Sequence, residues 1–296
     1  MEKLKLGIIG LSEGNGHPYS WAAICNGYDR KHMKDCPFPV IPEYLAKEKY
    51  PDNYIQDAVV SHIWTQDKVV SKEVALASRI ENVVDDYHEM LGVVDGILLA
   101  RDDAEKHYDM CKDFITAGMM VYIDKPLAFD IGTAGKIFAL ERFEGQIFSC
   151  SAMKYARELD ESMELVRNLG EIDYIEATVM KRWETYSAHI IDPLLRIIGD
   201  DIEIVDSKKI KGSGTQGVIL SLKDGKVISL LARNNENTPL SIRLFGRNDN
   251  LEISFDDTFY AFREALRDFI RSIRTHKSTI SKKHIMKMVE IIDRGL

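Results

Sequence analysis

A lysine followed by a proline is the residue pair in this chain best placed for proton chemistry. Lys125 follows an apolar stretch, residues 119–123, that is typical of a buried parallel strand, and Pro126 restricts the residues before it to an extended path. Open α/β sheets bind ligands at the carboxyl ends of their strands. A lysine there can bind a substrate hydroxyl and exchange its proton, which partial desolvation makes easier near neutral pH. The alternative is a surface lysine that simply follows a strand.

A glycine-rich turn near the start of the chain is typical of an anion-binding loop. Residues 7–17 read Gly-Ile-Ile-Gly-Leu-Ser-Glu-Gly-Asn-Gly-His, and glycines at such a turn let the backbone approach a pyrophosphate. A G-x-G-x-x-G pattern starting at Gly10 would need glycines where the chain has Ser12 and Asn15. Gly14 and Gly16 therefore indicate a longer loop. We assign Gly10, Ser12, Gly14 and Gly16 to a dinucleotide, with an ordinary glycine turn as the alternative.

Polar residues at the end of the second expected strand, residues 58–64, could hold the ribose of that dinucleotide. An acidic residue there usually binds the ribose 2′-OH, and Thr65 or Asp67 could serve. Asp67 could instead cap the following helix, and Trp64 could pack in the core or stack on adenine. These alternatives remain open on the sequence alone. No arginine closely follows residues 65–67 to take a 2′-phosphate, which favours NAD over NADP.

The elements that must position these residues differ between the two halves of the chain. The first half alternates apolar runs with helical periodicity, which predicts a parallel sheet with helices on its faces. We expect strands over residues 4–9, 58–64, 93–100, 119–123 and 146–152, and helices over 19–26, 43–49, 68–79 and 131–141, with another ending before Gly118. The second half predicts strands over 174–181, 218–222, 226–232, 240–245 and 250–255, and helices over 161–168, 190–198, 259–274 and 281–293.

The expected fold class is therefore α/β. A Rossmann dinucleotide-binding domain over residues 1–125 precedes an α+β substrate-binding and oligomerisation domain over residues 126–296. The sheet of the second domain is expected to be open and mostly antiparallel. The C-terminal helices could pack back on the first domain.

The most specific pattern lies between residues 94 and 128. It reads Val-Asp-Gly-Ile-Leu-Leu-Ala-Arg-Asp-Asp-Ala-Glu-Lys-His over 94–107 and Ala-Gly-Met-Met-Val-Tyr-Ile-Asp-Lys-Pro-Leu-Ala over 117–128. This resembles the glucose–fructose oxidoreductase/inositol dehydrogenase/MocA (Gfo/Idh/MocA) family, with its A-G-K-x-V-x-x-E-K-P-L-A segment. Asp124 replaces the usual Glu, and Arg101 and Asp102 replace a more usual Thr-Pro. The resemblance implies a cofactor, NAD or NADP, held by residues that include Ala100, Arg101, His107, Asp124 and Pro126, with His107 positioning the loop around the nicotinamide.

The resemblance continues through nearly the whole chain. Residues 150–156 look like the strand that enters the family's second domain, and His189 with Asp192 resembles its H-x-x-D helix. It implies that Lys125 and His189 are catalytic and that the substrate contacts Lys154, Tyr155, Tyr186 and Asp192. Each of these also has a structural interpretation: His189 as a packed or capping histidine, Asp192 as a favourable charge in the first turn of a helix, and Lys154 and Tyr155 as an exposed strand end.

One departure from the family concerns the proton relay. Many catalytic relatives carry an Asp four residues before this His, where the chain has Thr185. The usual acidic partner of His189 is therefore missing. We expect Asp192 or Tyr186 to compensate, or His189 to bind the substrate without relaying protons.

Composition argues against several other classes of protein. The 296 residues carry 39 Lys+Arg and 47 Asp+Glu, a net charge of −8, which argues against a partner bound through nucleic-acid phosphates. No basic amphipathic surface or long apolar run predicts membrane binding. The four cysteines are widely spaced, so neither a metal site nor a disulfide framework is predicted, and a reducing cytoplasm is expected.

The expected activity is hydride transfer to or from a carbinol or carbonyl carbon. The resemblance implies a small-molecule substrate: a sugar, polyol, sugar nucleotide or sugar acid. The alternative is a non-catalytic dinucleotide or sugar sensor on the same fold. Apolar side chains on both faces of the second expected sheet, together with the resemblance, predict a homodimer or homotetramer.

Overall fold

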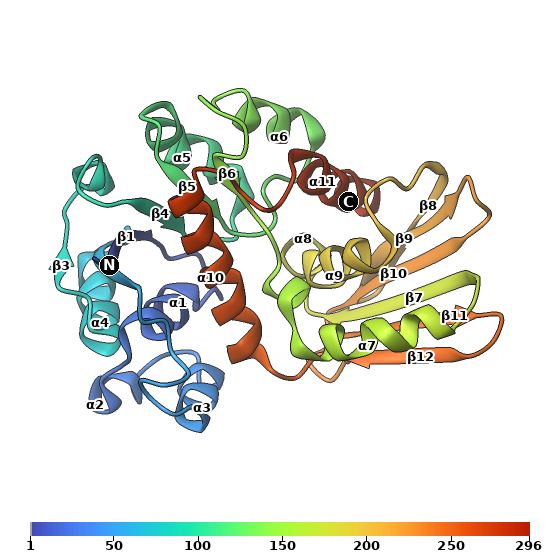
Figure 1. Ribbon diagram of the computed structural model, residues 1–296, viewed down its shortest axis with the longest axis horizontal. Coiled ribbons are helices and arrows are strands. Elements are labelled where there is room, and N and C mark those ends of the chain that lie inside the picture. The colour runs from blue at the N-terminus through green and yellow to red at the C-terminus, as the bar shows by residue number, and fades with distance from the viewer. Residues whose placement is uncertain (1) are drawn as a thin grey trace. The chain divides into compact units, whose positions relative to one another are not determined.

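A computed structural model describes residues 2–296, and Figure 1 labels its helices and strands. The chain forms two compact units. The first contains the segments up to Asp124, Gly135–Ser149 and Phe262–Ser281. The second contains Lys125–Ala134, Cys150–Ala261 and Lys282–Leu296. The chain first changes unit next to the expected boundary after residue 125, but it then returns to the first unit twice.

The first unit is built on a six-stranded parallel sheet in the order β3-β2-β1-β4-β5-β6. The strands are β1 (Leu4–Ile9), β2 (Ala58–Trp64), β3 (Asn82–Val83), β4 (Gly96–Leu99), β5 (Met120–Ile123) and β6 (Ile147–Phe148). Every residue of β4 and β5 is buried, as expected for apolar strands that are covered on both faces. The helices are α1 (His17–Asn26), α2 (Arg30–Met33), α3 (Val40–Lys47), α4 (Lys68–Ser78) and α5 (His107–Thr116).

The chain returns to the first unit because that unit needs an edge strand and a covering helix. Strand β6 pairs with β5, and α10 (Thr258–Thr275) packs on the sheet. The Phe269 ring of α10 lies 5.6 Å from the rings of both Tyr122 and Phe148. Gly96 leaves room for α10, since a Cβ there would lie 2.6 Å from Ile273. Residues 135–149 and 262–281 thus belong to the first unit rather than to the second.

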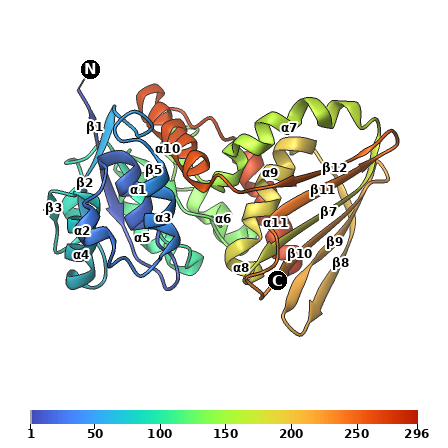
Figure 2. The same ribbon diagram turned by 90° about the horizontal axis from the view of Figure 1, so that it is seen from below.

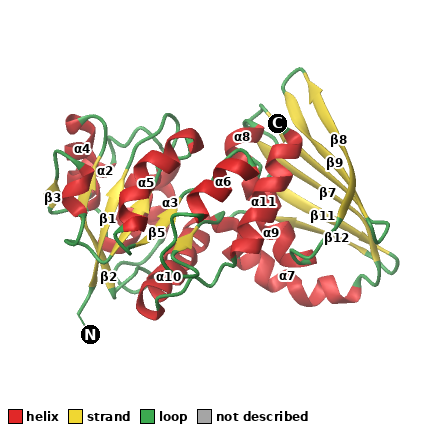
Figure 3. Cartoon of the chain, turned by 90° about the horizontal axis from the view of Figure 1, so that it is seen from above, coloured by secondary structure: helices red, strands yellow, loops and turns green. Residues whose placement is uncertain are grey.

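The second unit holds a mixed, mostly antiparallel sheet in the order β12-β11-β7-β10-β9-β8. Its strands are β7 (Ile172–Met180), β8 (Ile204–Gly212), β9 (Thr215–Leu222), β10 (Val227–Arg233), β11 (Ser241–Gly246) and β12 (Asn250–Ser254), and only β7 and β10 pair in parallel. Helices α7 (Arg157–Asn168), α9 (Ala188–Ile198) and α11 (Lys282–Gly295) lie on one face of this sheet (Figures 2 and 3). The expected α/β fold class, a Rossmann unit followed by an open and mostly antiparallel sheet, is confirmed.

Several predicted elements were wrong or incomplete. The strand expected over 146–152 is reduced to β6, because residues 152–155 form a 3-10 turn, η3 (Ala152–Tyr155). Helix α6 (Ile131–Phe138) ends three residues before its expected limit. Strand β8 was not predicted, because its lysine-rich sequence lacks the alternation of polar and apolar residues that is typical of a strand. Its strand conformation depends on pairing with β9. Helix α2 was not predicted. The Asp29 carboxylate caps it by accepting the N–H groups of Lys31 and His32.

None of the helices in residues 2–296 has the length and apolar composition that crossing a bilayer requires. The described residues also contain no group of three or more His, Cys, Asp or Glu side chains arranged to hold a metal ion.

Candidate active site

The loop after β1 turns sharply onto the start of α1 and is fastened to the loop after β4. The Ser12 hydroxyl donates to Asp102 Oδ1 at 2.5 Å and accepts the Asp102 N–H at 3.1 Å. Gly10 permits the turn, since a Cβ there would lie 2.4 Å from Cγ of Pro18. The expected glycine loop therefore stands at the carboxyl edge of the parallel sheet, where ligands of such sheets bind.

This loop has the groups that a pyrophosphate needs. Helix α1 begins at His17, after its N-cap Gly16, and the His17 N–H donates to Asn15 Oδ1 at 2.8 Å. The N–H groups of Glu13, Gly14 and Gly16 have no hydrogen-bond partner among the described residues. Gly14 has φ +76° and nothing within 4 Å of the place where a Cβ would stand. Free N–H groups in a turn that leads into a helix favour an anion, so the loop fits the phosphates of a dinucleotide.

Asp124 lies buried at the same edge, directly after β5. Its Oδ2 accepts from the Asn15 side-chain amide at 2.9 Å and lies 2.5 Å from Nδ1 of His17. The His17 ring stacks on Trp21 at 4.8 Å, and Trp21 stacks in turn on Tyr122 at 4.7 Å. Asp124 thereby connects the end of β5 with the start of α1.

Arg101 is buried in the loop after β4 and is fully engaged by its neighbours. Its guanidinium donates twice to Asp103, at 2.8 and 2.6 Å, and once to Gln66 Oε1 at 2.8 Å. Gln66 in turn binds both the N–H and the C=O of Leu11. His107 Nε2 lies 2.9 Å from the Arg101 carbonyl, so His107 holds this loop in place. The arginine is thus part of the scaffold that joins three loops.

Thr65 and Asp67, after β2, have local partners. The Thr65 hydroxyl donates to the Asp67 carbonyl at 2.6 Å and lies 2.8 Å from the Ser71 hydroxyl. The Asp67 carboxylate caps α4 by accepting the Val69 N–H at 2.8 Å. Trp64 is partly exposed and donates to the Asp85 carbonyl at 3.2 Å. Asp67 thus has the capping role that was one of its two interpretations, and Trp64 is not a core residue.

Lys125 opens the second unit and is only 3% exposed. Its ammonium donates to the Thr185 carbonyl at 3.3 Å and lies 5.7 Å from the centre of the Tyr186 ring. Lys181 donates to the Tyr186 hydroxyl at 2.6 Å. Lys125 is therefore not the surface lysine of the alternative interpretation.

His189 lies in the first turn of α9, with the edge of its ring against Tyr186 at 5.1 Å. Its Nδ1 is 2.8 Å from the hydroxyl of Ser151. Asp192 accepts the backbone N–H of Ser151 at 2.7 Å. Because α9 begins at Ala188, Asp192 lies beyond its first turn, and the first-turn interpretation was wrong.

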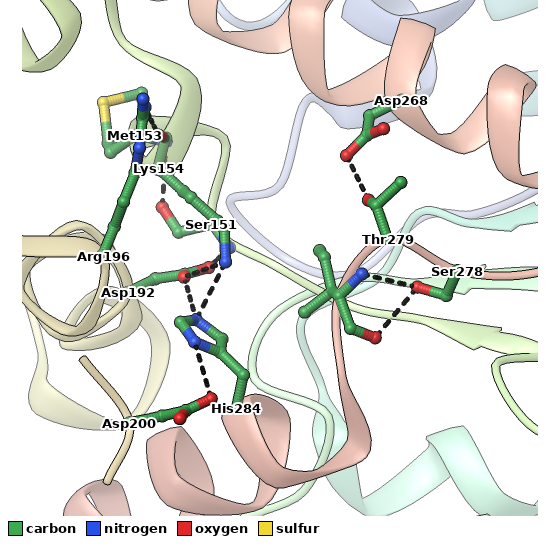
Figure 4. Close-up of polar contacts among 11 residues, drawn as sticks. Ser151, Met153, Lys154, Asp192, Arg196, Asp200, Asp268, Ser278, Thr279 and His284 are labelled. Atoms are coloured by element: carbon green, nitrogen blue, oxygen red, sulfur yellow. Dashed lines mark hydrogen bonds and ion pairs between the residues drawn. The ribbon is translucent and has the colours of Figure 1, made fainter. Parts of the chain in front are cut away.

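Asp192 is the centre of a buried network of charged side chains (Figure 4). Its Oδ1 lies 2.7 Å from Nε2 of His284 in α11 and 3.7 Å from the ammonium of Lys154 in η3. Nδ1 of His284 lies 3.7 Å from Asp200. Burial would raise the pKa of Asp192, but the charge of Lys154 and the hydrogen bonds from His284 and Ser151 outweigh it and lower that pKa. Lys154 is thus tied to Asp192 and is not part of an exposed strand end.

Comparison with known proteins identifies the first unit. Residues 43–151 match the model of the Gfo/Idh/MocA oxidoreductase family, which describes an NAD-binding Rossmann fold. This segment belongs to the Gfo/Idh/MocA family. The family resemblance inferred from residues 94–128 is thereby confirmed. No curated protein matches the chain at the level of sequence.

Solved structures share the fold across both units. Myo-inositol 2-dehydrogenase from Lactobacillus plantarum has a TM-score of 0.75 at 15% identity, over 98% of this chain and 95% of that one. Scyllo-inositol dehydrogenase from Lactobacillus casei has a TM-score of 0.73 at 14% identity, over 98% and 94%. GenD2 from gentamicin A biosynthesis, solved with NAD, has a TM-score of 0.74 at 14% identity, over 100% and 93%. At these identities the likeness shows the fold.

The Gfo/Idh/MocA pattern and the geometry together show which predicted residues gather. In the first unit, the glycine loop, Ala100, Arg101, His107 and Asp124 all lie at the carboxyl edge of the sheet. In the second unit, Lys125 and His189 both lie against Tyr186. Tyr155 lies half-buried in η3. Cys150, which the sequence analysis quotes in the entering strand, is buried.

The sequence analysis missed two residues that contact His189 or Asp192 in the second unit, namely Ser151 and His284. Ser151 stands in the segment that resembles the family, but a serine there has no spacing that marks it as a partner of a histidine 38 residues later. His284 is separated from Asp192 by 92 residues and reaches it only because α11 packs against α9. The network around Asp192 is therefore visible only in the fold.

Proposed function

We propose that the chain is an NAD(P)-dependent oxidoreductase that moves hydride to or from a carbinol or carbonyl carbon of a sugar, polyol, sugar nucleotide or sugar acid. The observation that carries the proposal is the buried ammonium of Lys125, bonded to the Thr185 carbonyl and placed against Tyr186 beside His189. The similar structures, which include two inositol dehydrogenases and a protein solved with NAD, support this substrate class and this cofactor.

The proposed roles follow from the chemistry of these side chains. The nicotinamide ring, when bound, supplies the site that accepts or gives the hydride. Lys125 holds the hydroxyl at the reacting carbon and exchanges its proton, and its low exposure keeps bulk water from competing for that proton. His189 donates to a substrate oxygen. Tyr186, Lys154, Tyr155 and Asp192 shape and fix the substrate site.

The cofactor contacts follow from the first unit. The free N–H groups of the loop over residues 10–16 bind the pyrophosphate, and Ser12 and Asp124 lie at the same edge of the sheet. Three of the five N–H donors of Arg101 are bound to Asp103 and Gln66, and the side chain is buried, so it is poorly placed to bind a 2′-phosphate. The carboxylate of Asp67 would also repel such a phosphate. We therefore propose NAD rather than NADP.

Titration with NADH should quench the tryptophan fluorescence of the chain. Trp21 stands in the aromatic stack behind the start of α1, so a pyrophosphate bound at that helix start changes its surroundings. We expect saturable binding of NADH well below millimolar concentration and weaker binding of NADPH. Fluorescence titration of the full chain measures both affinities.

A glycine substitution provides the control for this titration. Gly10→Val should weaken NADH binding strongly, because the side chain would collide with Pro18. Gly135→Ala is the matched variant, since that glycine lies in α6, has nothing within 4 Å of its Cβ position and has no positive φ. Absence of binding of either dinucleotide at millimolar concentration would end the oxidoreductase proposal.

A non-catalytic sensor on the same fold is the second candidate, and Thr185 is the observation that favours it. The residue that supplies an acid in many relatives is here a threonine whose carbonyl accepts from Lys125. A sensor would bind the dinucleotide and a sugar without changing either. The absorbance of reduced cofactor, followed on mixing with candidate keto sugars, separates the two, since only an enzyme consumes it.

Assembly through the second sheet is proposed from its open face. Buried and half-exposed residues alternate along β7 and β10. The half-exposed residues of the sheet include Leu231 of β10, Ile219 of β9 and Phe245 of β11. These positions lie on the face opposite the helices, where an apolar surface favours a self-complementary contact.

Light scattering at micromolar concentration should therefore report a mass of at least twice 33.7 kDa, that of a homodimer or of a tetramer built from such dimers. Leu231→Lys should shift the mass toward one chain. Leu165→Lys changes an exposed leucine of α7, on the helical side of the second unit, and should leave the mass unchanged. A stable single-chain mass for the unmodified protein would contradict the proposal.

A further inference from the structure

We propose that Ser151 is a positioning residue that fixes the tautomer of His189 and so takes over the task of the acid that Thr185 replaces. This inference rests on the proposed function for its catalytic meaning. The hydrogen-bond geometry that carries it does not depend on that function.

The first step is the hydrogen-bond inventory of the Ser151 hydroxyl. Its oxygen accepts the Met153 N–H at 3.2 Å and lies 2.8 Å from Nδ1 of His189. A serine hydroxyl has one proton to donate, and among the described residues Nδ1 of His189 is the only acceptor within reach. The hydroxyl proton therefore points to Nδ1, which must be unprotonated. The neutral imidazole then carries its proton on Nε2.

The second step concerns what holds Ser151 in this place. The residue is fully buried, and its backbone N–H donates to Asp192 Oδ2 at 2.7 Å. His189 and Asp192 are three residues apart on α9, so the same helix binds Ser151 twice, once through its hydroxyl and once through its backbone. The backbone bond fixes the position of the Ser151 main chain, and this keeps its hydroxyl within reach of Nδ1.

The third step concerns Asp192, whose own orientation is fixed from the other side. Its Oδ1 lies 2.7 Å from Nε2 of His284, which also lies 3.1 Å from the ammonium of Lys154. An ammonium has no lone pair to accept with, and a carboxylate has no proton to give. Nε2 of His284 must therefore carry a proton and donate it to Asp192, while Lys154 acts as an ion-pair partner of the carboxylate at 3.7 Å.

The consequence is a division of labour between the two predicted catalytic residues. A carboxylate on Nδ1 fixes a histidine and also stabilises its charged form. A neutral hydroxyl on Nδ1 fixes the tautomer without adding that negative charge. His189 is therefore a donor to a substrate oxygen through Nε2–H, and the exchange of the substrate proton is left to Lys125.

The test reads the tautomer directly. Two-bond ¹H–¹⁵N correlation spectra of the full chain, labelled at histidine nitrogens, are recorded at about pH 8.5, two units above the usual histidine pKa. His189→Asn identifies the His189 signals among the eight histidines. We expect an unprotonated Nδ1 and a protonated Nε2 for His189 in the unmodified protein. A protonated Nδ1 would overturn the proposal without any variant.

Two serine variants form a matched pair. Ser151→Ala should lower the preference for the Nε2–H tautomer by about 2–10-fold, the shift that one hydrogen bond of ordinary net strength produces. Ser187→Ala removes another fully buried serine, two residues before His189, whose hydroxyl has no partner among the described residues. It should leave the tautomer unchanged. Equal spectra for the Ser151→Ala variant and the unmodified protein would also overturn the proposal.

Kinetic measurements on the two serine variants distinguish failure of this inference from failure of the proposed function. With turnover, Ser151→Ala should lower kcat several-fold and change KM little, and it should alter the pH–rate profile while Ser187→Ala does not. The titratable groups around His189 that shape this profile are Tyr186, Lys125 and Lys181 on one side. Asp192, His284 and Lys154 lie behind Ser151. An unchanged profile for the Ser151→Ala variant would remove its role in the reaction. If no substrate is turned over, the proposed function fails and the spectra still decide the tautomer.

Discussion

Replacing Lys125 with methionine should lower turnover by about 10²–10⁴-fold, the usual contribution of a group that exchanges a proton in the reaction. Methionine keeps the apolar stem that is buried in the second unit but cannot donate to the Thr185 carbonyl or to a substrate hydroxyl. The affinity for NADH should change much less, because the residues that fit the pyrophosphate belong to the glycine loop of the first unit. Steady-state kinetics and the fluorescence titration measure the two effects separately.

Lys125→Arg distinguishes proton exchange from positive charge. Arginine keeps the charge and can donate to a carbonyl, but it does not release its proton at physiological pH. If Lys125 exchanges the substrate proton, the arginine variant should lose nearly as much turnover as the methionine variant. Recovery of turnover in the arginine variant would mean that charge alone is needed. Turnover of Lys125→Met within a few-fold of the unmodified protein would remove Lys125 from the mechanism.

The strands that position Lys125 were predictable because burial and local sequence agree in them. The limits expected for β1 and β2, residues 4–9 and 58–64, are those of the structure, Leu4–Ile9 and Ala58–Trp64. Strand β5 follows a glycine with φ +89°, Gly118, which ends the preceding helix. Lys125 could be placed at a strand end on the same local evidence.

The division of the chain was less predictable, because it depends on long-range pairing. β6 has only two strand residues and joins the first sheet through β5. α10 has the same kind of amphipathic pattern as α11, yet most of α10 belongs to the first unit and α11 to the second. An apolar face shows that a helix is partly buried, but it does not show which of the two sheets the helix packs against.

In the candidate site too, contacts that are local in sequence were predictable and contacts between distant segments were not. Asp67 stands directly before a helix, so its capping bond is local and was one of the two predicted interpretations. The partners of His189 and Asp192 come from η3 and α11, and residue types alone did not connect them. Asp192 or Tyr186 was expected to compensate for Thr185, or His189 to bind the substrate without relaying protons. In the structure the Ser151 hydroxyl lies 2.8 Å from Nδ1 of His189, and Tyr186 packs against its ring. Asp192 contributes indirectly by holding the Ser151 backbone.

Removing the carboxylate of Asp192 should destabilise the second unit strongly. Asp192 is fully buried and binds the Ser151 N–H, His284 and Lys154. Asp192→Ala leaves two buried donors and the half-buried ammonium of Lys154 without their shared acceptor. Breaking a buried charged interaction in this way costs about 3–5 kcal/mol. Asp192→Asn keeps an acceptor for the Ser151 N–H and should cost less. Urea denaturation at pH 7 gives the free energies of unfolding.

The pH dependence of that loss identifies its cause. The surroundings of Asp192 hold its pKa below the ordinary value of 3.8, so the folded state binds this proton less readily than the unfolded state. The stability that the ionised group contributes is fully present above that ordinary value and is lost as the pH falls through the lowered pKa. The difference between the unmodified protein and Asp192→Asn should therefore stay constant from pH 5 upward and shrink below about pH 4. Asp201→Asn removes an exposed carboxylate that pairs with Lys283 and should change stability by less than about 1 kcal/mol at any pH. Equal losses in the Asp192→Asn and Asp201→Asn variants would show that Asp192 is not the centre of a buried charge network.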